Sequence, residues 1–171
     1  ASGWNDPDRP AEMIEVGMIA YDAVRQVEIA SYTSLLKPLK NQLLSEYCLN
    51  ILPIRQSEID KAPEFESVMS EIFVWLNHHA SPDSPTAACG KIDRTHTTDQ
   101  TSRHNVIDPF RNRSHIEVDT LVKTALGIAT QIEREDVRNS LGIQPIAGRH
   151  RALADSADLI AFDLALARMN K

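Results

Sequence analysis

Cysteine, long apolar runs and positive charge are all scarce in this chain, and each scarcity excludes a class of protein. Only Cys48 and Cys89 occur in 171 residues. They are too few and too isolated for a disulfide framework or a thiolate metal site, so we interpret them as reduced thiols and expect a cytoplasmic protein. No apolar run approaches the ~20 residues of a membrane span, and no signal peptide is visible.

Basic residues are outnumbered by acidic ones. The chain has 18 Lys and Arg against 24 Asp and Glu, which gives a net charge of −6. This balance argues against a protein that coats nucleic acid through bulk charge. It is compatible with an enzyme that binds one end of a nucleic-acid strand through a metal ion and a few local cations.

The rest of the composition is typical of a soluble globular protein, with 42% hydrophobic and 25% charged residues. The length suits one domain with a substantial core. Hydrophobic periodicity predicts an antiparallel hairpin of strands, two further short strands, and helices between and after them. The strands are expected at 13–21, 28–36, 86–89 and 115–118, and the helices near 43–51, 65–78, 94–114, 120–125, 134–141 and 153–168. This order indicates an α/β fold with a mixed sheet.

The last predicted helix carries the most informative residues. It is apolar almost all round, so we expect it to be largely buried. At about 100° per residue, Asp155 falls on the stripe of Leu159 and Phe162, and His150 lies in the preceding loop. A carboxylate on a buried stripe needs a partner, and a titratable histidine nearby suggests a metal-assisted hydrolytic site. The alternative is that Asp155 caps the helix.

Six short segments then match one family in order and spacing. They are residues 1–4 (Ala-Ser-Gly-Trp), 12–17 (Glu-Met-Ile-Glu-Val-Gly), 36–38 with 44–48 (Leu-Lys-Pro, Leu-Ser-Glu-Tyr-Cys), 59–65 (Ile-Asp-Lys-Ala-Pro-Glu-Phe), 90–94 (Gly-Lys-Ile-Asp-Arg) and 150–155 (His-Arg-Ala-Leu-Ala-Asp). On these residues the chain resembles the DEDDh (DnaQ-like) 3′→5′ exonucleases. It is most similar to the branch of histone-mRNA 3′-end and RNAi-modulating exonucleases. The resemblance implies an RNase H-like mixed sheet flanked by helices.

The same resemblance implies a chemistry. Asp93 and Asp155 would ligate Mg²⁺ or Mn²⁺ in a two-metal site, and His150 would be the general base. Two-metal hydrolysis of phosphodiesters needs clustered carboxylates, and a histidine pKa near 6.5 suits proton transfer at neutral pH. The expected reaction removes nucleoside 5′-monophosphates from 3′ ends of RNA or single-stranded DNA.

Two positions bear on substrate binding. Tyr47 stands where the branch has an aromatic residue that can stack on the terminal base. Such stacking is worth ~1–3 kcal/mol per base, although a core tyrosine is an equal alternative. Cys89 stands where the branch often has a tryptophan, so a second stacking surface is missing and the substrate preference stays open.

The Asp-x-Glu pair of the family's first motif is absent from this chain. By the resemblance, it would lie just before Ala1, in the central strand of the sheet. We therefore expect residues 1–171 to form a single exonuclease-like domain that lacks its first strand. Beside the strand at 13–21 we expect either a gap or residues from outside this sequence. The alternative is a catalytically inactive module that binds nucleic acid or a partner. The sequence leaves the oligomeric state open.

Overall fold

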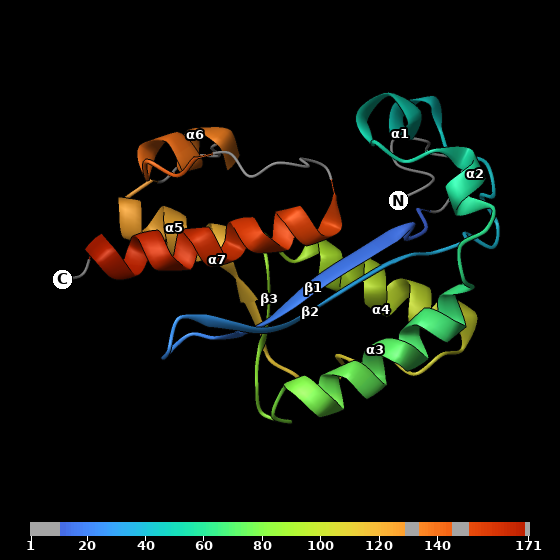
Figure 1. Cartoon of the computed structure of the whole chain (residues 1–171), viewed down its shortest axis with the longest axis horizontal. Helices are drawn as coiled ribbons and strands as arrows, with labels where there is room; N and C mark the ends of the chain where they lie inside the picture. The colour runs from blue at the N-terminus through green and yellow to red at the C-terminus, as the bar shows by residue number, and fades with distance from the viewer. Residues whose placement is uncertain (1–10, 129–133, 145–150, 170–171) are drawn as a thin grey trace.

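An antiparallel hairpin lies between two helical layers in the computed structural model, which describes residues 11–128, 134–144 and 151–169 (Figure 1). β1 (Glu15–Asp22) pairs with β2 (Val27–Leu35) along its whole length. The helix α3 (Phe65–His79) packs on one side of the hairpin, and α7 (Ala152–Met169) crosses the other. The predicted hairpin is therefore confirmed, and it is shared by both layers.

The two faces of β1 serve different helices because side chains alternate along a strand. Val16 and Met18 pack on the cluster that contains Leu36, Phe65 and residues of α3. Glu15 and Gly17, on the opposite face, contact the start of α7. The alternation of the sequence thus places an apolar face toward α3 and leaves the other for α7.

Short helices close one end of the hairpin. They are α1 (Glu46–Ile51) and α2 (Gln56–Ile59), and Ser45 caps α1 by accepting the N–H of Cys48. Their buried side chains form a second cluster with Ile14 of the segment that enters β1. The carboxylate of Glu12 anchors the loop before α1, since it accepts the backbone N–H groups of Leu39, Lys40 and Asn41.

The remaining strands form a separate parallel pair, β3 (Thr86–Ala88) with β4 (His115–Glu117). The helices that follow them are α4 (Ile92–His104), α5 (Val118–Leu126) and α6 (Arg134–Ser140). Within the described ranges, β1 pairs only with β2 and β3 only with β4. The prediction of a buried strand at 86–89 is wrong in part, because β3 is shorter and Ala87 is exposed.

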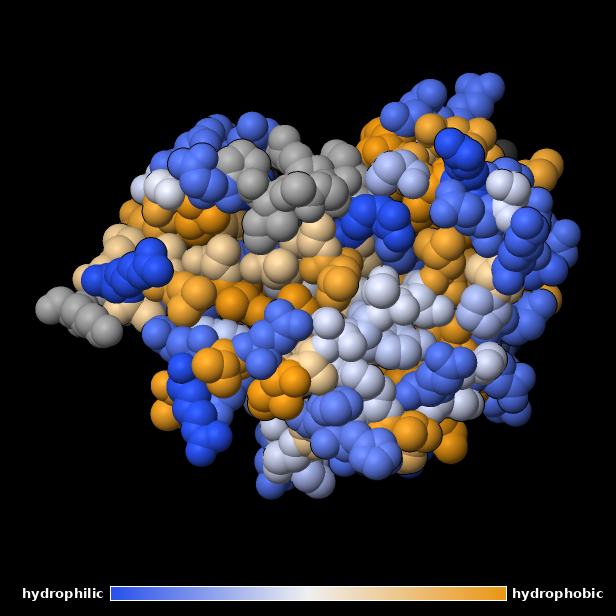
Figure 2. Space-filling view, in the orientation of Figure 1, coloured by the Kyte–Doolittle hydropathy of each residue, from blue (hydrophilic) through white to orange (hydrophobic). Residues whose placement is uncertain are grey.

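α7 is less buried than its apolar sequence predicted. Only Asp158, Phe162 and Ala165 are fully buried. The helix forms an outer layer: one side lies on β1, another meets α5 and α6 in a third apolar cluster, and the rest faces outward. Figure 2 shows this outward side as a band of hydrophobic surface along α7. No helix in the described part of the chain is long and apolar enough to cross a membrane.

The backbone edge of β1 that faces away from β2 is contacted by α7. Leu36 donates to the Ile14 carbonyl across the hairpin at 2.9 Å. Because hydrogen-bonded and non-bonded pairs alternate along an antiparallel ladder, Gly17, which lies opposite Thr33, directs its carbonyl away from β2. Ser156 of α7 donates its hydroxyl to this carbonyl at 2.9 Å. The Gly17 carbonyl on this edge of β1 thus bonds to a helix side chain.

Gly17 is the residue that permits this close approach. A Cβ atom there would lie 2.2 Å from the backbone nitrogen of Leu153. We therefore expect Gly17→Ala to lower the free energy of unfolding by ~1–3 kcal/mol, the usual cost of overpacking, as measured by chemical denaturation. Gly90→Ala is the matched control, because a Cβ there has nothing within 4 Å. Equal stability of the Gly17→Ala protein would contradict the contact between α7 and β1.

Candidate active site

Asp155 lies in the first turn of α7 and is half-buried. The helix begins at Ala152, so Asp155 is its fourth residue. The N–H of Asp155 donates to the Arg151 carbonyl at 3.0 Å. The amide of Ala152 is bound by Glu15 from another element. Asp155 therefore lies inside the helix and not at its N-cap position, and the role of its carboxylate stays a prediction.

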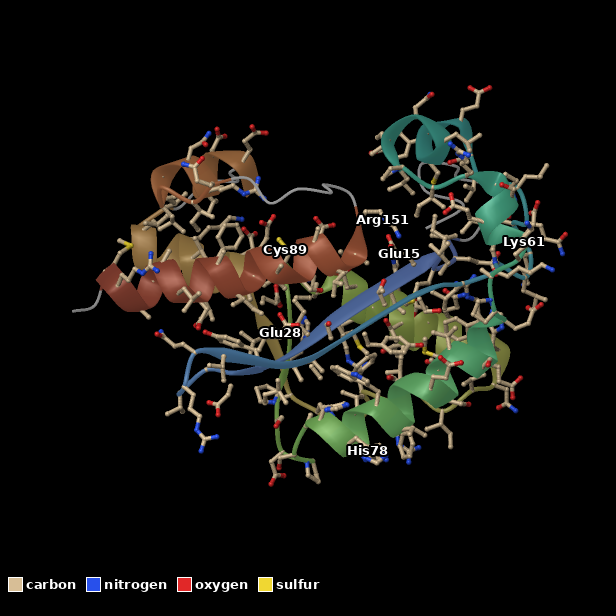
Figure 3. All side chains as sticks on the ribbon, in the orientation of Figure 1. Glu15, Glu28, Lys61, His78, Cys89 and Arg151 are labelled. Atoms are coloured by element: carbon tan, nitrogen blue, oxygen red, sulfur yellow. The ribbon has the colours of Figure 1, made fainter. Side chains whose placement is uncertain are left out.

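Glu15 holds the start of α7 from β1. Its two carboxylate oxygens accept the Nε of Arg151 at 2.7 Å and the backbone N–H of Ala152 at 3.1 Å. Figure 3 shows Glu15 and Arg151 next to each other, where β1 and α7 both begin. The sequence analysis missed this contact, because the only local signal is a charged residue at the start of a mostly apolar strand.

Asp93 lies in the first turn of α4, shortly after β3, and is exposed. Cys89, between the same two elements, is a half-buried free thiol whose carbonyl accepts the N–H of Asp119 at 2.9 Å. β3 also contacts α7. The two carboxylates singled out in the sequence thus belong to α4, which follows β3, and to α7, which contacts β3, and their convergence stays a prediction.

Tyr47 is the second residue of α1, and 43% of its surface is exposed. This exposure excludes the alternative of a core tyrosine. Its ring is accessible for stacking, although its role stays a prediction. His150 and the first-motif tail at 1–4 lie outside the described residues.

The residues present do not by themselves complete a metal centre. Within the ranges that the structure describes, no group of three or more His, Cys, Asp or Glu side chains could hold a metal ion. Two-metal hydrolysis needs several clustered carboxylates. The described residues therefore do not fit a complete two-metal site, and Asp93 and Asp155 remain two separate candidates.

A buried ion pair that the sequence analysis also missed joins α6 to α7. Arg138 and Asp158 are both almost fully buried, and Nη2 of Arg138 donates to Oδ2 of Asp158. Among the described residues, Nε of Arg138 and Oδ1 of Asp158 have no hydrogen-bond partner. A second carboxylate in the apolar helix, one turn after Asp155, was the available signal, but nothing local identified its partner.

Removing one charge of this pair leaves the other buried without compensation. We expect Asp158→Asn to lower the free energy of unfolding by ~3–5 kcal/mol, measured by denaturant titration. The matched control is Asp119→Asn, which breaks the more exposed Asp119–Lys123 pair within α5 and should cost ~0.3–0.5 kcal/mol. A loss under ~1 kcal/mol for Asp158→Asn would show that the pair is open to water.

Burial also raises the pKa values of two tyrosines of the hairpin. The pKa of Tyr32 is raised to about 12, first by burial and then by its hydrogen bond to Glu71. Burial, followed by the charges of Asp163 and Asp22, raises the pKa of Tyr21. Both phenols therefore remain protonated at neutral pH, and neither is a base in the candidate site.

Comparison with known proteins agrees with this architecture. The model of the exonuclease family RNase_T matches residues 4–162. The 3′-5′ exonuclease eri1 of Schizosaccharomyces pombe is 34% identical over 70 residues, which cover 41% of this chain and 24% of that protein. The 3′-5′ exonuclease crn-4 of Caenorhabditis elegans is 32% identical over 71 residues, 40% of this chain and 24% of that protein. The chain thus matches about a quarter of the length of each relative.

Solved structures share the fold at low sequence identity. A full-length 3′-exonuclease superposes with a TM-score of 0.81 at 16% identity, over 98% of this chain and 76% of that one. The nuclease domain of 3′hExo, a DEDDh family member bound to rAMP, gives 0.77 at 16% identity, over 98% and 86%. The expected RNase H-like exonuclease fold is therefore confirmed.

Proposed function

This chain belongs to the exonuclease family RNase_T, and we propose from this that it acts as a 3′→5′ exonuclease on RNA or single-stranded DNA. The observation that carries the proposal is the placement of Asp155. The last residue of the His-x-x-x-x-Asp segment lies in the first turn of a helix whose start is bound to β1. The product is a nucleoside 5′-monophosphate, because attack on the terminal phosphodiester leaves the phosphate on the released nucleotide.

A divalent cation, Mg²⁺ or Mn²⁺, is part of this proposal. Asp93 and Asp155 supply two carboxylates, and oxygen ligands of this kind suit both ions. Because the described residues hold no larger ligand group, further carboxylates have to come from outside the described residues. We therefore assign the two aspartates as candidate ligands and derive no step of the reaction through the metal.

The remaining roles belong to the chain's own side chains. His150 takes a proton from the attacking water, a role that histidine fills most often among side chains. Tyr47 supports the terminal base by stacking, and Cys89 lies beside the same strand end as Asp93. RNA is the favoured substrate because one neighbour recognises the 3′ end of a histone mRNA stem-loop. Cys48 and Cys89 form no disulfide in the described part of the chain, and reduced cysteines are typical of cytoplasmic proteins, so we include a cytoplasmic location in the proposal.

A second candidate function is binding without hydrolysis. The specific observation in its favour is the lack of a three-ligand group in the described part of the chain. A domain of this fold without catalysis would still present Tyr47 and the surface around α1 to a 3′ end. Hydrolysis and binding therefore have to be measured separately on the same labelled oligoribonucleotide.

A substitution of Asp155 distinguishes hydrolysis from binding without hydrolysis. We expect Asp155→Asn to abolish Mg²⁺-dependent release of mononucleotides from a 5′-labelled oligoribonucleotide and to leave thermal unfolding nearly unchanged, because a ligand charge is lost without a cavity. Asp83→Asn, an exposed loop change, is the control and should keep full activity. An active but less stable Asp155→Asn protein would refute the ligand role. Binding without hydrolysis by the unmodified chain would favour the binding module.

Tyr47 gives an independent test of the 3′-end site. Loss of one stacking contact costs ~1–3 kcal/mol, so Tyr47→Ala should weaken binding of the oligoribonucleotide about 5- to 150-fold in fluorescence anisotropy. Tyr47→Phe keeps the ring and should bind like the unmodified protein. Since Tyr47 is exposed, neither change should alter stability much. Equal affinity of all three proteins would place the terminal base elsewhere.

A further inference from the structure

Glu15 is a carboxylate that the fold keeps away from water. Only 8% of its side chain is exposed. Burying a carboxylate is costly unless it is paired and hydrogen-bonded. Among the described residues, Glu15 meets this requirement with two donors from one segment, the Nε of Arg151 and the N–H of Ala152. The buried carboxylate therefore binds the start of α7.

The donors explain why a carboxylate stands at this position. The first N–H groups of a helix have no partner inside it, and the helix dipole favours a negative charge there. Glu15 satisfies both conditions from a neighbouring strand, and its second oxygen binds a guanidinium. A glutamine would replace one of the two acceptor oxygens by an NH₂ donor and would carry no charge. A carboxylate is thus favoured at this position because both donors come from the start of α7.

Two further contacts fix the same turn of the helix. The backbone of Leu153 lies directly on Gly17, and Ser156 donates to the Gly17 carbonyl. Asp155 lies between these contacts in sequence, and its N–H closes the first turn on Arg151. The position of its carboxylate relative to β1 is therefore set by Glu15, Gly17 and Ser156 together.

We propose that Glu15 is a positioning residue for the candidate active site: through Arg151 and Ala152 it holds the first turn of α7, and with it Asp155, against β1. This inference rests on the proposed exonuclease function for its effect on the reaction. It does not rest on that function for its structural consequence. Glu15 touches no reacting atom and acts through the helix that it binds.

The test compares Glu15→Gln with Glu28→Gln, which makes the same chemical change on the exposed part of the hairpin. Figure 3 shows Glu28 far along the hairpin from Arg151. A second variant, Arg151→Gln, removes the partner, and Lys61→Gln is its exposed control. If Glu15→Gln fails to fold, Arg151→Gln still tests the contact, because Arg151 is itself partly exposed.

The structural measurement is hydrogen–deuterium exchange of amides in the first turn of α7. A hydrogen bond to a charged group protects its donor, so Glu15→Gln should speed exchange there about 10- to 100-fold, while α3 stays unchanged. Both control variants should exchange like the unmodified protein. Unchanged exchange at the start of α7, or an increase spread evenly over the whole chain, overturns the inference.

The functional measurement is steady-state hydrolysis of the oligoribonucleotide by full chains that remain folded at the assay temperature. Glu15→Gln should lower kcat about 10- to 100-fold, the usual effect of a residue that orients a functional ligand, with KM changed by less than about twofold. An unchanged kcat in a protein with faster exchange in α7 overturns the positioning role. If the unmodified chain shows no hydrolysis, the proposed function fails, and the exchange experiment still decides whether Glu15 holds α7.

Discussion

The contact between β1 and α7 is the constraint on which the rest of the structure depends. It requires a strand with two different faces, and the alternation of Glu15 and Gly17 with Val16 and Met18 supplies them. One face is apolar and packs on α3, whereas the other carries Glu15 and Gly17 and contacts the start of α7. Because the hairpin belongs to both layers, any shift of α7 along β1 would change the candidate site without disturbing the core around α3.

The parts of this arrangement that the sequence predicted are those with a local signal. The hairpin and α3 follow from periodicities of two and 3.6 residues, which are visible within one segment. The motif at 150–155 indicated a functional Asp155 because histidine and aspartate stand close together in the chain. Glu15 gave no such signal, since its partners lie 136 and 137 residues away. Only the folded chain shows that a charge on a strand completes the start of a helix.

Asp158 illustrates the same limit within one helix. The apolar stripe directed attention to Asp155, which is half-buried, whereas the buried carboxylate of α7 is Asp158. Its partner, Arg138, comes from α6, and no spacing rule links the two positions. The expectation that α7 is largely buried holds only in part, for a related reason. Apolar composition shows that a helix can pack on several sides, but the neighbours decide how many sides are covered.

Burial distinguishes the acidic residues that hold segments of the fold together from an acidic residue that is a candidate metal ligand. Glu12, Glu15 and Asp158 are shielded from water, and each meets backbone amides or a guanidinium that holds two segments together. Asp93 is exposed, where an ionised carboxylate keeps its hydration and needs no such partner. A carboxylate already neutralised by the fold has little left to offer a metal, so Glu12, Glu15 and Asp158 are poorer candidate ligands than Asp93. The acidic residues that hold the elements of the candidate site in place are therefore different residues from the candidate metal ligands.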